Sequence, residues 1–343
     1  MIDFNYENLT LARQYHGLSQ KDLASLVDIA QSSLSKIEKG QLIPSDETMS
    51  KLVSHLGFTT KFYESKNANV SALSFHGYRK QASVPISKVN KILSEIIIKT
   101  SHQNFIKNYF PNKSIDFSYY ESLSSSELAK TIRTEWQVDN RPIDDLTLHI
   151  ENMGIDIFLC DFEEAQVDGV TSKSIEGYKG IFINKNQPGD RYRFSLAHEL
   201  CHYLKHSSEP ICTKEMEDEA NDFAAELLMP TEALKDKLKT TRLNDYAALK
   251  KEWKVSMAAL IFRAKTLGTI TPNQSTNLWK QMAMHGFRRV EPFPIEIEEP
   301  KRIYEAFSSL AYDDLLLELN LTSEMFQMLY KDFYSTGVKT LSG

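Results

Sequence analysis

The sequence has few cysteines and no long apolar run. Its three cysteines, Cys160, Cys201 and Cys212, are odd in number and lack the paired spacing of metal ligands. These features argue against a disulfide scaffold and predict reduced thiols. No apolar stretch approaches the roughly 18 residues that a membrane span needs, and the chain starts without a basic segment followed by an apolar one. We therefore expect a cytoplasmic, globular protein with no membrane partner.

The sequence also lacks an excess of basic residues. The formal net charge of −6 argues against a protein that coats nucleic acid along its whole surface, but it leaves DNA binding by one domain open. The 343 residues exceed the usual size of a single core and predict two or three domains of roughly 100 to 150 residues each. We find no internal repeat and no low-complexity tract.

Hydrophobic periodicity and chain-breaking residues predict helices and short strands. Polar residues at 64–69 predict a linker, and apolar residues at helical spacing predict a long helix from 86 to about 109. Beyond about 290, a charged linker should precede two final helices. The remaining expected elements are helices at 126–136, 191–206 and 215–228 and strands at 155–160 and 180–184.

The run His198-Glu199-Leu200-Cys201-His202 predicts a metal centre. Residues four apart on a helix are neighbours, so both imidazoles can point at one ion. Glu199 lies beside them and can hold a water molecule. Two histidines at this spacing with a glutamate between them are typical of zinc peptidases, in which the glutamate is the general base. The alternative is a surface helix whose two histidines are merely solvated.

A catalytic zinc ion needs a third protein ligand and an open fourth position. On the next helix Glu217 lies at the edge of the apolar side, where a carboxylate costs free energy unless it is paired with a cation. We predict Glu217 as the third ligand, with Glu219 as the alternative. Asn221 is expected to hydrogen-bond a ligand. His206 would lie about 6 Å further along its own helix, and we expect it to cap or pack.

The segment 18–40 predicts a helix, a tight turn and a second helix. The polar face of the second helix contains Gln31, Ser32, Ser35 and Lys36, and glutamine and lysine there can reach base edges in a major groove. Through residue 62, however, six basic residues stand against seven acidic ones, so the field expected of a DNA binder is weak. A dimer or bent DNA would compensate. The alternative is a small helical bundle that contacts proteins.

A second helix-turn-helix pattern occurs at 253–264, and there we favour packing over DNA contact. Arg193 and Tyr203 are weak candidates for stabilising a reaction oxyanion, and for both we favour a structural role.

The blocks at 180–184, 193–202 and 219–230 resemble the ImmA/IrrE family of zinc metallopeptidases, and the resemblance extends over roughly residues 75 to 300. It implies a zincin-like α+β domain in which His198, His202 and Glu217 hold Zn²⁺. Glu199 would take a proton from the attacking water and pass it to the leaving amine. The family usually has glycine in place of Cys201, so tight packing and redox sensitivity at that turn are open questions.

The segment 6–57 resembles the helix-turn-helix of the Cro/C1-type, or XRE, repressors. The resemblance implies a double-stranded DNA operator as partner. By position, Gln31, Ser32 and Lys36 would read bases, whereas Gln20 and Ser33 would contact phosphate.

The expected fold is therefore an all-α helix-turn-helix domain joined to an α+β zincin-like metallopeptidase domain with a helical carboxyl-terminal extension. The predicted boundaries are 1–62 for the helix-turn-helix domain, 63–110 for a linker and long helix, 111–290 for the metallopeptidase domain and 291–343 for the extension.

Together the two resemblances predict a transcriptional regulator, able to form a homodimer, whose zinc endopeptidase cleaves a regulatory protein such as a repressor or a toxin partner. The metallopeptidase family commonly acts in stress response, mobile-element control or phage defence. Two alternatives stay open. One is a transcription factor or antitoxin whose zinc domain only senses or stabilises, and the other is a metal-free scaffold.

Overall fold

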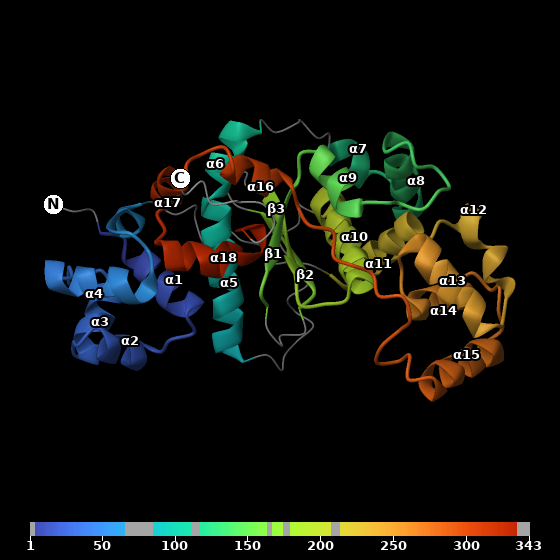
Figure 1. Cartoon of the computed structure of the whole chain (residues 1–343), viewed down its shortest axis with the longest axis horizontal. Helices are drawn as coiled ribbons and strands as arrows, with labels where there is room; N and C mark the ends of the chain where they lie inside the picture. The colour runs from blue at the N-terminus through green and yellow to red at the C-terminus, as the bar shows by residue number, and fades with distance from the viewer. Residues whose placement is uncertain are drawn as a thin grey trace, which may run out of the picture.

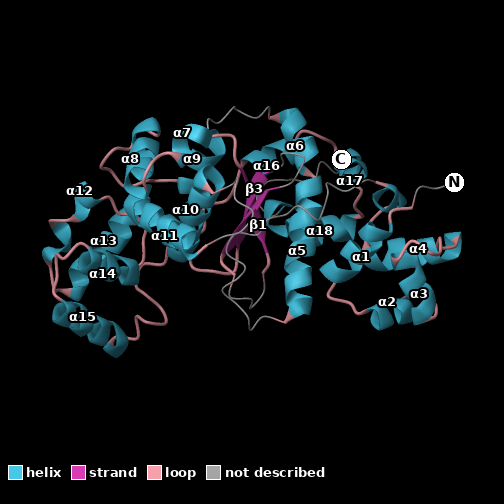
Figure 2. Cartoon of the chain, turned by 180° about the vertical axis from the view of Figure 1, so that it is seen from behind, coloured by secondary structure: helices cyan, strands magenta, loops and turns pink. Residues whose placement is uncertain are grey.

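The computed structural model describes residues 4–65, 85–110, 117–162, 167–173, 179–206 and 213–334. Within them a small β-sheet lies between two helical lobes, and the molecule is elongated and arched (Figure 1 and Figure 2). We call residues 4–65 the N-terminal lobe and residues 231–290 the distal lobe. The predicted fold class is confirmed: a helical amino-terminal domain precedes a mixed helix and sheet domain with a helical carboxyl-terminal region.

The N-terminal lobe contains the predicted helix-turn-helix. Ser19 begins the first of its two helices with a capping box, because its side chain accepts from the Asp22 N–H and the Asp22 carboxylate accepts from the Ser19 N–H. Asp28 has a φ of 56° in the turn before the second helix. The elements are α1 (Tyr6–Tyr15), α2 (Gln20–Leu26), α3 (Gln31–Glu38), α4 (Asp46–Leu56) and the 3-10 helix η1 (Thr60–Glu64).

The sheet has three strands in the order β1-β3-β2. β1 (Asp156–Cys160) pairs in parallel with β3 (Lys179–Asn184), and β2 (Gly169–Lys173) pairs with β3 in antiparallel fashion. β1 and β3 are the two predicted strands. The sequence prediction missed β2, because its five residues are short and mostly small or polar, without a clear apolar alternation.

Among the described residues, five helices lie between the N-terminal lobe and the strands in sequence, and the first two helices after the strands contain the predicted metal ligands. The helix predicted from 86 to 109 is wrong as a single element: His102 interrupts it, with its backbone N–H bonded to the Lys99 carbonyl three residues back. The helices predicted at 126–136, 191–206 and 215–228 are confirmed within two residues. The bounds are α5 (Ile86–Ser101), α6 (Gln103–Tyr109), α7 (Phe117–Glu121), α8 (Ser125–Glu135), α9 (Leu146–Asn152), α10 (Gly189–Lys205) and α11 (Lys214–Leu228).

The distal lobe packs directly on α11. The Arg263 guanidinium donates to the Glu226 carboxylate and, at 3.2 Å, to the Met229 carbonyl. The pattern at 253–264 lies here with one face buried, as the packing prediction requires. The lobe consists of α12 (Thr231–Leu234), η4 (Lys237–Lys239), α13 (Leu243–Trp253), α14 (Met257–Thr266) and α15 (Pro272–Met284).

The carboxyl-terminal region returns to the N-terminal lobe. It forms α16 (Arg302–Phe307), α17 (Tyr312–Leu319) and α18 (Ser323–Tyr334), one helix more than predicted, because α16 has only six residues and gives little periodic signal. Phe58 and Leu321 form a β-bridge, and the Thr322 N–H donates to the Gly57 carbonyl at 2.9 Å. The two ends of the described chain are thereby joined.

The sheet separates two hydrophobic cores. Ile157 and Ile181 contribute to the core shared with α10, α11 and the distal lobe. Phe158 and Phe182 contribute to the core shared with the N-terminal lobe, α5 and the carboxyl-terminal helices. Nearly all residues of β1 and β3 are buried. Because successive strand residues point to opposite faces, this means that both faces of the sheet are covered. In the described part of the chain, no helix is both long and apolar enough to cross a membrane.

Two predicted features, part of the linker and one of the three cysteines, lie outside the described residues. They are residues 66–84 of the predicted linker and Cys212. Cys160 and Cys201 are both buried free thiols, and burial raises the pKa of both, so each thiol stays protonated. Cys201 lies fully inside the core, where a buried protonated thiol is expected to be inert.

Candidate metal centre

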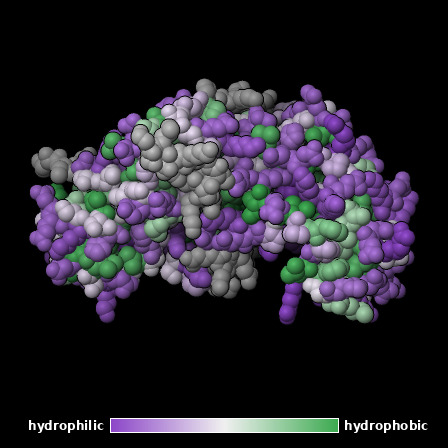
Figure 3. All heavy atoms as spheres, in the orientation of Figure 1, coloured by the Kyte–Doolittle hydropathy of each residue, from purple (hydrophilic) through white to green (hydrophobic). Residues whose placement is uncertain are grey.

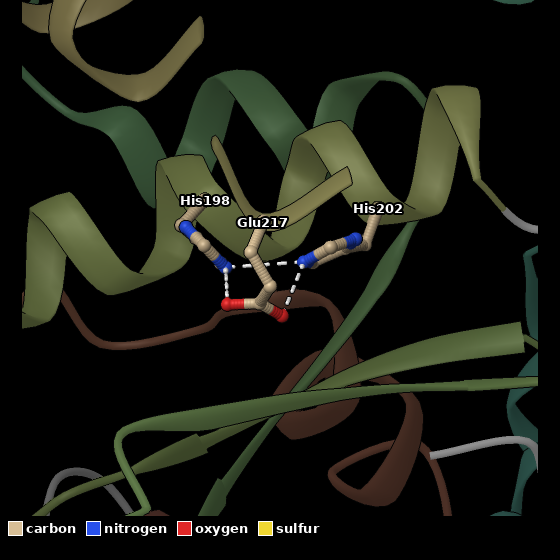
Figure 4. A group of neighbouring side chains, drawn as sticks. All are labelled: His198, His202 and Glu217. Carbon is tan, nitrogen blue, oxygen red and sulfur yellow. Dashed lines mark hydrogen bonds and ion pairs between the residues drawn. The ribbon is translucent and has the colours of Figure 1, made fainter. Parts of the chain in front are cut away.

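A close backbone contact fixes the start of α10, the helix that carries the histidine motif. The Gly189 N–H donates to the Ile295 carbonyl at 3.1 Å, and a Cβ atom at Gly189 would lie 2.2 Å from that oxygen. Only glycine fits this approach. From this start, α10 buries Leu200 in the core and directs His198 and His202 toward Glu217 of α11 (Figure 4).

The three predicted ligands lie together. The Nε2 atoms of His198 and His202 are 3.1 Å apart. The two carboxylate oxygens of Glu217 lie 3.5 Å from His202 Nε2 and 3.7 Å from His198 Nε2 (Figure 4). One ligand atom from each residue falls within 4.8 Å of the others. His202 is fully buried, whereas His198 and Glu217 are partly accessible, so the centre opens on one side.

Hydrogen bonds on the far side of each ring determine which nitrogen carries the proton. His206 Nε2 lies 2.9 Å from the Glu219 carboxylate, which can only accept, so this nitrogen donates. Burial lowers the pKa of His206, and its neutral ring then presents an accepting Nδ1 atom, 2.8 Å from His202 Nδ1. His202 must donate from Nδ1. Its Nε2 atom therefore carries a lone pair that faces Glu217.

His198 follows the same logic. Its Nδ1 atom lies 3.1 Å from the side-chain oxygen of Asn221, which accepts, so Nδ1 carries the proton and Nε2 carries a lone pair. In these tautomers both Nε2 atoms, which lie 3.1 Å apart, present lone pairs. Together with Glu217, two imidazole nitrogens and a carboxylate converge on one point, which is an arrangement that a cation satisfies.

The spacing fits a tetrahedral ion. With ligand distances of about 2.0–2.1 Å, the ligand atoms of a tetrahedral zinc site lie about 3.3–3.4 Å apart. The observed separations of 3.1, 3.5 and 3.7 Å lie around that value. Burial also lowers the pKa of His202 to about 4, so this imidazole stays neutral and able to bind metal at neutral pH.

Glu199 lies against β2. The Thr171 hydroxyl donates to the Glu199 carboxylate at 2.7 Å, and the same hydroxyl lies 2.9 Å from the Glu199 backbone carbonyl. A Cβ atom at Gly169 would lie only 2.8 Å from Glu199 Cγ, so the strand approaches the side chain closely. Burial raises the pKa of Glu199 to about 8, and the nearby negative charge of Glu217 adds to this rise. Thr171 was not predicted as a site residue, because β2 itself was missed.

The alternative candidates have other roles. Glu219 forms an ion pair with Lys205 at 3.1 Å and holds His206, so it acts behind the ligands, while Glu217 faces them. His206 is the carboxyl-terminal cap of α10, as predicted, but its contact with His202 was missed. Arg193 is fully buried and donates to the Ile143 carbonyl at 2.7 Å and to Glu298.

Tyr203, the other residue weighed as an oxyanion donor, is also buried, and its ring lies beside Phe117 and below the Lys179 ammonium. Arg193 and Tyr203 therefore both have structural surroundings, as the sequence analysis favoured.

The candidate DNA contacts lie on the N-terminal lobe. Gln31, Ser32 and Lys36 are exposed on α3, and Ser33 is half-buried. The Gln20 amide donates to the Glu38 carboxylate at 2.7 Å, and Glu38 also holds Arg13 at 2.6 Å. The structure therefore places a polar, accessible face on α3 and gives Gln20 a partner within the lobe. Which of these side chains touch DNA stays a prediction.

Comparisons with known proteins find a family match in two separate regions of the chain. Residues 9–62 match the family model described as helix-turn-helix, and residues 150–265 match a peptidase family model described as the IrrE N-terminal-like domain. An HTH-type transcriptional regulator of Haemophilus influenzae is 43% identical over 53 residues, which are 16% of this chain and 54% of that protein. The match thus covers about half the length of this relative. Both predicted resemblances are confirmed.

Proposed function

We propose that this chain is a cytoplasmic DNA-binding regulator that also hydrolyses peptide bonds of a regulatory protein. Its helix-turn-helix domain precedes its IrrE N-terminal-like peptidase domain, and a repressor is the first candidate substrate. The helix-turn-helix domain implies DNA binding, and the peptidase family is typically metal-dependent. The observation that carries the enzymatic part is the convergence of His198, His202 and Glu217, whose ligand atoms lie within 4.8 Å of one another.

The donor set fits zinc. Two neutral imidazoles and one carboxylate are the ligands of many catalytic zinc sites, and the accessible side leaves room for a fourth ligand. When bound, zinc would supply Lewis acidity that polarises a substrate carbonyl and activates water. Asn221 and His206 hold the two imidazoles in the tautomers that this ligation requires.

Glu199 is the proposed base. The pKa of its buried carboxyl group would fall below its present value of about 8 once a divalent cation is held nearby, because an opposite charge favours the carboxylate. Thr171 fixes one carboxylate oxygen by its 2.7 Å hydrogen bond. Glu199 would then take a proton from the attacking water and deliver it to the leaving amine.

β2 offers a place for the peptide. It is one of the two edge strands of the sheet, and in the described part of the chain no strand pairs with its outer side. An extended substrate would pair with this edge through backbone hydrogen bonds. Because Gly169 and Thr171 of β2 contact Glu199, a peptide bound there would lie beside the proposed base.

The test compares wild-type protein with Glu199→Gln. Zinc-loaded full-length protein is incubated with candidate repressors, and fragments are identified by intact mass. We expect a specific fragment from wild type and a loss of at least about a hundredfold in rate from Glu199→Gln, because general-base catalysis contributes about 10²–10⁴-fold. Zinc content and DNA binding should be unchanged. An equal fragment from both proteins would refute the role of Glu199.

The same variant separates the alternative function. If the zinc centre only senses or stabilises, Glu199→Gln should regulate its promoter as wild type does. Loss of regulation by a folded, zinc-containing Glu199→Gln protein would instead support proteolysis.

A further inference from the structure

The N-terminal lobe has little positive charge for a DNA-binding domain. Through residue 62 six basic residues stand against seven acidic ones. Two of the six are already paired: Arg13 with Glu38 at 2.6 Å, and Lys51 with Glu47 at 3.0 Å. Phosphate contacts by lysine and arginine supply most non-specific DNA affinity. The attraction to DNA must therefore come largely from elsewhere in the molecule.

The distal lobe has the opposite balance. Residues 231–290 contain twelve lysines and arginines and only four acidic residues, whereas the rest of the chain contains 28 basic and 42 acidic residues. An excess of eight positive charges is therefore concentrated in sixty residues of an acidic chain. Such a field attracts a polyanion to this end of the molecule.

Ion pairs remove only part of this excess. Lys250 is buried and paired with Asp190, and Arg263 is buried and paired with Glu226. Both of these positive charges are therefore neutralised by carboxylates from outside the lobe. Each of the four acidic residues of the lobe already has a basic partner at 2.6–2.9 Å. These pairs are Glu232 with Lys130, Asp236 with Lys239, Asp245 with Arg242 and Glu252 with Lys237.

Six basic side chains of the lobe stay exposed and form no ion pair with a carboxylate among the described residues. Two of them stack on aromatic rings, Lys251 on Phe293 and Arg288 on Trp279, which orders the stems while the charges face solvent. The six are Lys235, Lys251, Lys265, Lys280, Arg288 and Arg289.

The two lobes project to the same side of the sheet. In Figure 1 and Figure 2, α3 and α15 both lie at the lower edge, at opposite ends of the molecule, and Figure 3 shows a notch at that edge beside the distal lobe. A straight duplex that runs beneath the arch would reach both lobes. This geometry offers a linear polyanion two contact points along one molecule.

We propose that the distal lobe binds the phosphate backbone of the same duplex that α3 contacts, and so supplies the positive charge that the N-terminal lobe lacks. This inference rests on the proposed DNA binding by the helix-turn-helix domain. It assigns no base reading to α14, the helix of the second helix-turn-helix pattern, because α14 exposes Phe262 and has no amide side chain.

The experiment measures the salt dependence of affinity for a random-sequence duplex that is longer than the protein, using fluorescence anisotropy of the labelled DNA. The variant is Lys265→Gln with Lys280→Gln in the full chain. The matched control is Lys214→Gln with Lys301→Gln, which removes two exposed charges outside both lobes. Circular dichroism confirms that both proteins fold.

We expect the slope of log affinity against log salt to fall in magnitude by about 2 for the distal-lobe variant, because each lost phosphate contact contributes about 0.9. The control should match wild type. On a duplex too short to extend past the N-terminal lobe, all three proteins should bind alike.

A slope unchanged by Lys265→Gln with Lys280→Gln on the long duplex would overturn the inference. So would a variant that keeps its DNA slope but loses binding to poly-glutamate, since the lobe would then serve an acidic protein. If wild type binds no duplex at any salt, the DNA-binding part of the proposed function fails instead.

Discussion

The hydrogen bond between His206 and His202 should set the metal affinity of this protein. His206→Leu removes the acceptor for His202 Nδ1–H, which lies 2.8 Å away in a buried position. A buried donor left without a partner costs about 1–3 kcal/mol. His202 can avoid this cost by moving its proton to Nε2, the atom that faces Glu217. That tautomer cannot bind a metal ion through Nε2.

The expected loss is ten- to a hundredfold in zinc affinity, or about 1.4–2.7 kcal/mol, the usual effect of removing a hydrogen-bond partner behind a metal-binding histidine. His206→Gln should keep most of the affinity, because its side-chain carbonyl can accept the same proton. Glu219→Gln should lower the affinity a few-fold, since a neutral amide holds His206 less strongly than a carboxylate does. Glu215→Gln is the matched control, on an exposed position of the same helix.

Zinc affinity is measured by competition with a chromogenic chelator, and circular dichroism establishes that each variant is folded. Thermal unfolding with and without zinc gives a second measure, because a ligand stabilises the folded state according to its affinity. A folded His206→Leu protein with wild-type affinity would refute the tautomer argument. The same conclusion follows if His206→Gln loses as much affinity as His206→Leu.

Two further substitutions test other parts of the structure. Gly169→Ala places a Cβ atom 2.8 Å from Glu199 Cγ, so it should displace that side chain and lower kcat by about a hundredfold at unchanged zinc content; wild-type kcat would contradict the close approach. Burial raises the pKa of Glu151 to about 7, from 4.5 when unfolded, so the free energy of unfolding should fall as pH rises from about 4.5 to about 7. The expected fall in the free energy of unfolding is at most about 3 kcal/mol, and Glu151→Gln should flatten it when unfolding by denaturant is measured across that pH range. If Glu151→Gln shows the same pH dependence as wild type, Glu151 is not the source of the fall.

Features that depend on local sequence were predictable. α10 and α11 have apolar residues at helical spacing and end at clear breaks, so their bounds were found within two residues. The histidine pair follows from the same spacing. Glu217 was identifiable because a carboxylate at the edge of an apolar face needs a cation, which is a local argument.

Features that depend on distant partners were not predictable. β2 is a strand because it pairs with β3 and covers Glu199, and its own five residues carry little strand signal. The role of His206 requires Glu219, which lies on another helix, so spacing along α10 could not reveal it. The interruption at His102 likewise accompanies a 2.6 Å contact with Tyr330 near the other end of the chain.

The bridge between Phe58 and Leu321 bears on how the chain folds during synthesis. Its two residues are separated by most of the sequence, so the amino-terminal helices emerge from the ribosome long before their docking partner exists. The helix-turn-helix can form early from local contacts and can pack on α5, but its docking against α17 and α18 must wait for those helices. A nascent or truncated chain would therefore carry a DNA-binding unit not yet held in its final orientation to the metal centre.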